Sequence, residues 1–280
     1  VSGFIRKIKN NLRMRRGAGI FQPYYNFIKL FSKAQVVSKN TSWVFTVTPA
    51  IVLASSLCAC FLIPVFRPGI SLNNMGDLLA IFFIFGLGRF FLALAGLDAG
   101  SSFGGMGSSR EMFISAIAEP AAFISLFVLG MNSGSTSVAV VAGVQYLRAS
   151  TLLAGVAFFM VVIAETSRVP VDNQETHLEL TMVHEAMVLE YSGRQLAIIE
   201  LAGHLRQIIL FTMLSWFLFP FFNDPQWQWL QFPLKIMAIS VMVALLEVSL
   251  AKMRLFRVVD YLGFAFFITL LAAVAACMGI

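Results

Sequence analysis

Seven long apolar stretches dominate the sequence, and each is long enough to cross the hydrocarbon core of a bilayer, which takes roughly 20 apolar residues in a helix. They lie near 44–66, 77–97, 111–131, 149–165, 196–222, 232–252 and 258–280. Because every backbone N–H and C=O inside hydrocarbon must be paired within the protein, separate stretches of this length favour helices over a barrel. The sequence predicts an all-α polytopic membrane protein with seven visible transmembrane helices, and residues 1–280 as one transmembrane domain.

The charge distribution predicts how these helices are oriented. Charged residues make up only 12% of the chain, against about 25% in soluble domains. Nine of the twenty basic residues precede the first complete span, within the segment 6–42, and no acid occurs before Asp77. Lys and Arg are enriched in cytoplasmic loops, so this basic segment is expected on the cytoplasmic side. The net charge of +6 is therefore explained by membrane topology. The expected partner is the lipid bilayer, and nucleic-acid binding is not expected. Within the segment, Gln22 to Lys33 is expected to form an amphipathic helix.

An acidic loop is expected at residues 166–195, also on the cytoplasmic side. Six of the chain's fourteen acids crowd into the 26 residues that start at the end of the fourth span: Glu165, Asp172, Glu175, Glu179, Glu185 and Glu190. Pro170 is expected to end the preceding helix. Asp172, followed three residues later by Glu175, resembles a capping box that begins a new helix. On that helix His177 and His184 would share one face.

Several charged side chains fall inside the predicted spans. Arg89 and Glu119 lie at similar depths in neighbouring spans, so they are the first candidate for an intramembrane ion pair. Glu200 is followed one helical turn later by His204. Placing a charged side chain at the centre of a bilayer costs roughly 2.5–3.5 kcal/mol of insertion free energy, so each of these residues calls for a functional explanation. Four helices each place a glutamate in the cytoplasmic half of the membrane (Glu119, Glu165, Glu200 and Glu247), which favours a hydrated proton path, although any one of them alone could simply fix helix packing.

Other patterns exclude common kinds of site. The three cysteines lie in apolar segments and have no metal-ligand spacing. His184-Glu185 begins like a metalloprotease motif, but Val188 stands where a second histidine is needed. The GGMG sequence at 104–107 is expected to be a flexible loop entering a helix, since no Lys-Ser pair follows it. No metal site and no complete catalytic site are expected in this chain.

Four motifs together resemble a known family. They are RMRRGAGIFQPYYNFIKLFSK (13–33), GLDAGSSFGGMGSSRE (96–111), AETSRVPVD (164–172) and EYSG (190–193). Their order is similar to that in the heel subunit of respiratory complex I and in its relatives of membrane-bound nickel–iron hydrogenases and formate hydrogenlyase. The second motif, and Glu247 with the nearby Arg254, resemble the hydrogenase side of the family more closely.

The resemblance implies a fold and a set of site residues. The family has eight transmembrane helices, so Val1 to Ile5 is expected to be the end of a first helix that is largely absent from this sequence. In complex I the loop after the fifth helix borders the quinone cavity and opens into a glutamate-lined channel. The matching loop residues are Glu165, Arg168, Asp172, Glu175, Glu179 and Glu190; Glu119 matches a channel glutamate and Arg110 an arginine of the preceding loop. Where the family alternates three acids, this chain has His177 between Glu175 and Glu179.

The function implied is that of a non-catalytic subunit of an oxidoreductase complex in a prokaryotic cytoplasmic (inner) membrane. It would anchor a soluble redox module and begin a proton or sodium path. Its partners would be hydrogenase-like large and small subunits, an iron–sulfur subunit and antiporter-like membrane subunits. Nickel–iron and iron–sulfur centres are expected in those partners, with none bound by this chain and quinone possible. The alternatives are a quinone-site subunit, a stand-alone secondary transporter and a purely structural anchor.

Overall fold

A computed structural model describes residues 1–38, 41–63, 76–143, 148–172, 183–220 and 228–279. Its helices are α1 (Ser2–Leu12), α2 (Gln22–Ser32), α3 (Trp43–Leu62), α4 (Leu78–Asp98), α5 (Ser102–Ser133), α6 (Val138–Ala142), α7 (Ala149–Glu165), α8 (His184–Val188), α9 (Gly193–Leu218), α10 (Gln228–Ser249) and α11 (Leu255–Cys277). Six of them are long and apolar enough to cross a membrane, and α7 is a shorter apolar helix. The seven predicted apolar helices and the all-α polytopic membrane fold are confirmed.

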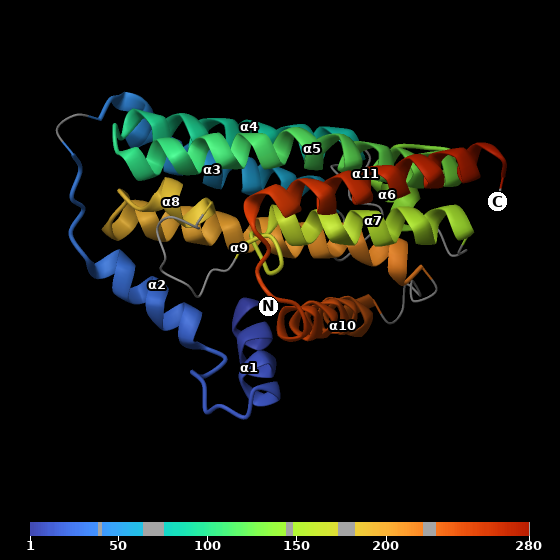
Figure 1. Cartoon of the computed structure of the whole chain (residues 1–280). Coiled ribbons are helices and arrows are strands. Elements are labelled where there is room, and N and C mark those ends of the chain that lie inside the picture. Colours follow the sequence, from blue (N-terminus) through green and yellow to red (C-terminus); the bar gives the residue numbers. More distant parts are fainter. Residues whose placement is uncertain (39–40, 64–75, 144–147, 173–182, 221–227, 280) are drawn as a thin grey trace.

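The helices form a bundle whose long members lie roughly along one direction (Figure 1). Helices α3, α4 and α5 pack side by side, and α11 packs against both α5 and α7. Helix α9 contacts α3 and α7. The small helices α1 and α2 lie with α10 along the opposite edge of the bundle from α4 and α5 (Figure 1).

The two N-terminal helices pack against the bundle from outside. Helix α2 forms as predicted, with Pro23 in its first turn, and packs on α9. The expected helix end at Val1–Ile5 is part of a longer helix, α1, which packs on α10 and buries Gly3, Ile5 and Lys9. The sequence pattern did not predict this helix, because its basic residues resemble a solvated interfacial segment.

The interpretation of GGMG as a flexible loop is wrong, because residues 104–107 form the first turns of α5. Ser101 caps the helix by accepting a hydrogen bond from Gly104 N at 3.1 Å. A Cβ atom on Gly104 would lie 2.4 Å from the carbonyl oxygen of Gly96 on α4. A Cβ on Gly107 would lie 2.9 Å from Cβ of Ala186 on α8. The glycines therefore serve close helix packing, which fixes α8 against α4 and α5.

The EYSG motif fixes the connection between α8 and α9 to α3. The Tyr191 ring stacks on Phe45 with centroids 4.0 Å apart, and its hydroxyl donates to the Phe45 carbonyl oxygen at 2.9 Å. In an α-helix that oxygen would accept from the residue four positions later, but this residue is Pro49, which has no N–H. The tyrosine thus satisfies a buried carbonyl group that proline leaves without its helical donor.

Candidate functional site

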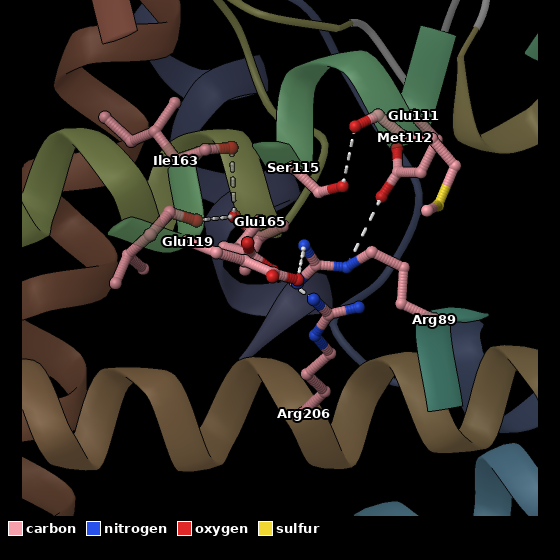
Figure 2. Close-up of polar contacts among 10 residues, drawn as sticks. Arg89, Glu111, Met112, Ser115, Glu119, Ile163, Glu165 and Arg206 are labelled. Atoms are coloured by element: carbon pink, nitrogen blue, oxygen red, sulfur yellow. Dashed lines mark hydrogen bonds and ion pairs between the residues drawn. The ribbon is translucent and has the colours of Figure 1, made fainter. Parts of the chain in front are cut away.

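A cluster of arginine and glutamate side chains joins four helices of the bundle. Arg89 of α4 donates to Glu119 of α5 at 2.8 Å and also to Glu165 at the end of α7. Arg206 of α9 donates to the same Glu165 carboxylate. Figure 2 shows both guanidinium groups pointing toward Glu165, with Glu119 beside it. The predicted ion pair of Arg89 and Glu119 is present, and Glu165 extends it to α7 and α9.

The cluster contains a third acid, Glu111, whose Oε1 lies 3.9 Å from Nε of Arg89. Three carboxylates therefore face two guanidinium groups. The side chains of Arg89 and Glu165 are each only 3% exposed, whereas that of Glu119 is 34% exposed. A buried charge of this kind is tolerated only when it is paired. Glu165 is accordingly held between two arginines, while Glu119 pairs with Arg89 and keeps access to its surroundings.

A cavity of about 410 Å³ lies next to this cluster. Residues of α1, α2, α8, α9 and α10 and the segment 165–169 line it. Its titratable and charged lining residues are Arg6, Lys9, Glu165, Arg168, His184, Glu185, Glu200, His204, Arg206 and Glu247. Its apolar lining includes Ile5, Phe27, Leu196 and Ile199. The cavity thus brings together predicted residues from the acidic loop and from two separate spans, and Glu165 connects it to Arg89 and Glu119.

Glu247 lies at the α1 side of the cavity and is 4% exposed. Nη1 of Arg168 donates to its Oε1 at 2.6 Å, and Nζ of Lys9 donates to its Oε2 at 3.1 Å. One carboxylate therefore holds together α10, α1 and the connection after α7. Like Glu165, it is held by two cationic side chains.

Asp172 lies at the start of the acidic loop and is 2% exposed. Its Oδ1 accepts from Nζ of Lys252 at 2.7 Å, and its Oδ2 accepts from the backbone N–H of Val183 at 3.0 Å. The helix that Asp172 was expected to cap, with Glu175, His177 and Glu179, lies outside the described residues. Asp172 therefore joins the two described ends of the loop and binds them to the connection before α11.

Glu200 differs from Glu165 and Glu247 because no ion pair or hydrogen bond holds its carboxylate within the described part of the chain. It is exposed toward the cavity, and the carboxylate of Glu185 repels its negative charge. His204, one helical turn later, lines the same cavity and packs edge-on against Phe27, with ring centroids 5.4 Å apart. Glu200 therefore differs from the two buried cavity glutamates in having no cationic partner among the described residues.

The remaining predicted residues lie around the ion-pair cluster and the cavity. His184 and Glu185 begin α8 and line the cavity. Glu190 is exposed at the end of α8 and is not among the cavity residues. Arg110 is half-buried on α5, directly before Glu111. Among the described residues, no group of three or more His, Cys, Asp and Glu side chains is arranged to hold a metal ion.

The residues that the sequence pattern did not single out are Glu111, Arg206, Lys9 and Lys252. Arg206 carries the same signal as Arg89, an arginine inside a predicted span, which calls for an acidic partner at its depth. Glu111 lies about two helical turns before Glu119, which puts the two acids on one face of α5. Lys9 and Lys252 give no signal, because each resembles one more member of a basic segment. Only the packing of α1 and of the α10–α11 connection pairs them with acids.

A family model described as NADH dehydrogenase matches residues 1–278, nearly the whole length of the chain. The chain belongs to the NADH dehydrogenase family. The resemblance that the four sequence motifs indicate is thereby confirmed.

Two curated relatives come from Escherichia coli strain K12. Formate hydrogenlyase subunit 4 is 31% identical over 98% of this chain and 94% of its own length. Hydrogenase-4 component C is 30% identical over 94% of this chain and 87% of its own length. A third relative, a subunit of the NADH-quinone oxidoreductase of Syntrophotalea carbinolica, is 28% identical over 75% of this chain and 68% of its own length. Each of these relatives is one component of an oxidoreductase complex.

A solved structure shares the fold of this NADH dehydrogenase family chain. A chain of the membrane-bound sulfane sulfur reductase, an archaeal respiratory membrane complex, superposes with a TM-score of 0.84. The match covers 98% of this chain and 93% of that chain, at 17% sequence identity. The likeness shows the fold.

Proposed function

We propose that this chain is the membrane-anchoring, ion-path subunit of a complex I-like membrane-bound hydrogenase or formate hydrogenlyase-type complex. It would couple redox chemistry in a docked soluble module to translocation of protons or sodium ions. One observation carries the proposal: Glu165 lines the cavity and also binds Arg89, the partner of Glu119. A change of charge in the cavity can therefore act on the Glu119 carboxylate of α5 through two direct contacts.

The proposed mechanism is electrostatic. Redox chemistry beside the acidic loop changes the charge or position of its carboxylates and histidines, and this change biases protonation in the cavity. Glu200 takes up the proton first, because no cation holds its carboxylate within the described residues. Glu165 and Glu247 respond through their arginine partners, Arg206 and Arg168. Glu119 receives the proton or electrostatic signal at the far end of the cluster.

The partners and location belong to the same proposal. The soluble module would comprise hydrogenase-like large and small subunits and an iron–sulfur subunit, which hold the nickel–iron and iron–sulfur centres. Antiporter-like membrane subunits would receive the ion path. The bundle end that carries α8 and the acidic loop would face the cytoplasm across a prokaryotic inner membrane, in agreement with the excess of Lys and Arg on that side.

The test is ion uptake per redox turnover by the whole complex in proteoliposomes, with Glu119→Gln in this chain. We expect turnover to continue with an artificial electron acceptor while ion uptake is lost or severely reduced. Assembly is checked by the subunit composition of the purified complex. If ion uptake stays coupled to turnover in an intact Glu119→Gln complex, the proposal is contradicted, and the chain would then serve only as a structural membrane anchor. Ion flux by the isolated subunit alone would instead favour the secondary transporter.

The cavity itself favours quinone binding as the second candidate function. Its volume of about 410 Å³ lies within the roughly 300–1,000 Å³ of small-molecule sites. Its lining combines apolar side chains such as Phe27 and Ile199 with hydrogen-bonding groups such as His204. Quinone recovered from the purified complex, together with inhibition by quinone-site blockers, would establish this function. Protection of His204 from chemical modification by added quinone would locate the site.

A further inference from the structure

The outward face of α11 carries an acidic residue in an apolar surface. This outer face of α11 is defined by Phe256, Asp260, Phe264, Phe267, Leu271 and Val274, which follow a helical repeat. Its hydrophobic members are between 48% and 85% exposed. The opposite side of the helix, with Val258, Leu262, Ala265, Thr269 and Ala272, is buried against the bundle. Asp260 therefore lies on the side that no other described helix covers.

Asp260 is distinctive among the acids of the described long helices. Only Glu200 and Asp260 are exposed there, and Glu200 lines the cavity. Asp260 has no hydrogen-bond or ion-pair partner among the described residues, although Arg257 precedes it by one helical turn. It lies five residues after Leu255, the first residue of α11, and so about 7.5 Å along the helix at 1.5 Å per residue. A carboxylate that faces outward from a membrane helix needs a cation or water.

Two other features suit this face to a protein partner. Helix α11 buries the smallest share of its apolar stretch among the six long helices. Gly263, next to Asp260 on the same side, has no atom within 4 Å of where a Cβ would lie. A small residue on a membrane helix lets a second helix approach closely. Anionic lipid headgroups on the expected cytoplasmic side would repel the carboxylate rather than pair with it.

We infer that the outer face of α11 docks a transmembrane helix of another membrane subunit, which presents a lysine or arginine to Asp260. The apolar residues Phe264, Phe267 and Leu271 supply packing area, and the ion pair fixes the depth of the second helix. A second copy of this chain fits less well, because its own Asp260 would bring a like charge to the contact. The inference rests on the proposed membership of a membrane complex and is independent of the ion path.

The test uses the whole complex in native membranes, with a photo-crosslinking amino acid at Phe267 and an affinity tag on this chain. Irradiation is expected to join this chain to a different membrane polypeptide. A crosslinked dimer of this chain, or adducts with lipid alone, overturns the inference. Because the readout is a covalent adduct, a failed crosslink in a complex that still couples ion uptake to turnover overturns the docking face and leaves the proposed function intact.

A charge series tests the role of Asp260 itself. Asp260→Lys places like charges together and is expected to lower the crosslink yield from Phe267 by about tenfold or more. Asp260→Glu keeps the charge and is expected to retain most of the yield. An unchanged yield in Asp260→Lys removes the ion pair from the inference. If Asp260→Lys fails to accumulate in membranes, the crosslink yield of Asp260→Asn is compared with that of Asp260→Glu. Equal crosslink yields in these two variants would likewise rule out the ion pair.

Discussion

Asp172, in the connection after α7, accepts a hydrogen bond from Nζ of Lys252, in the connection before α11, at 2.7 Å. The same two connections are joined by the N–H of Met253, which donates to the Pro170 carbonyl oxygen at 2.9 Å. Arg168 adds its contact to Glu247 at 2.6 Å. The start of the acidic loop is thus fixed to the end of α10 and the beginning of α11, so a displacement of the loop moves groups at the cavity.

Asp172→Asn weakens this attachment. The neutral asparagine cannot form an ion pair with the Lys252 ammonium. Breaking a buried charged hydrogen bond costs about 1–3 kcal/mol, so we expect a lower melting temperature of the purified protein in detergent. Hydrogen exchange at the amides of Val183 and Met253 is expected to become faster. Arg254→Met serves as the control on the α10–α11 connection, because the Arg254 side chain is exposed. Equal effects of the two variants would contradict the attachment.

Glu165→Gln is expected to destabilise the protein more than Glu119→Gln does. Glu165 binds two arginines and is 3% exposed, whereas Glu119 binds Arg89 and is 34% exposed. Removal of one partner from a buried ion pair costs about 3–5 kcal/mol, because the remaining charge is left without compensation. Thermal unfolding of both variants in the same detergent measures the difference. A combined Glu165→Gln and Arg206→Met variant should recover part of the loss, and no recovery would argue against a direct pairing.

Gly107→Ala tests the packing of α8 on α5. The added Cβ would lie 2.9 Å from Cβ of Ala186 and 3.0 Å from the backbone N of Met187. Overpacking of this kind costs about 1–3 kcal/mol. Gly105→Ala is a matched control, since its Cβ would meet only Cδ2 of Leu97 at 4.0 Å. The control is expected to be neutral or stabilising by up to about 1 kcal/mol through helix propensity. Melting temperatures that fall equally in both variants would show that close approach at Gly107 is not limiting.

The apolar stretches could be predicted because length and hydropathy alone determine whether a helix can span a membrane. The ion pair of Arg89 and Glu119 could be predicted for a related reason, since a charge in an apolar span needs a partner at its own depth. The length of α5 could not be predicted, because its first turns are rich in glycine and serine. Packing against α4 and α8 overrides the weak helix propensity of these residues. The two contacts that hold Glu247 could not be predicted either, because the cationic side chains come from residues 238 and 79 positions away in the sequence. Periodicity along one helix holds no information on such distant contacts.

Tyr191→Phe is expected to lower stability by about 1–3 kcal/mol, because it leaves the Phe45 carbonyl oxygen buried without a donor. Tyr24→Phe, on the exposed side of α2, is the control and should change stability by less than about 0.5 kcal/mol. Thermal unfolding of both variants at neutral pH measures the difference. A Tyr191→Phe protein as stable as the control would mean that the Phe45 carbonyl group finds another donor.

The same hydrogen bond predicts a pH dependence. Burial raises the pKa of the Tyr191 hydroxyl well above its usual value. The folded protein therefore holds this proton more tightly than the unfolded chain, whose tyrosines ionise near pH 10. The stabilisation from Tyr191 is present in full below about pH 10 and is lost as the pH rises above that value. Melting temperatures measured from pH 7 to pH 11 should show a constant difference between wild type and Tyr191→Phe up to about pH 10, and a smaller one above it. A difference that stays constant up to pH 11 would mean that the hydroxyl ionises in the folded protein at the same pH as in the unfolded chain, and that burial does not hold its proton.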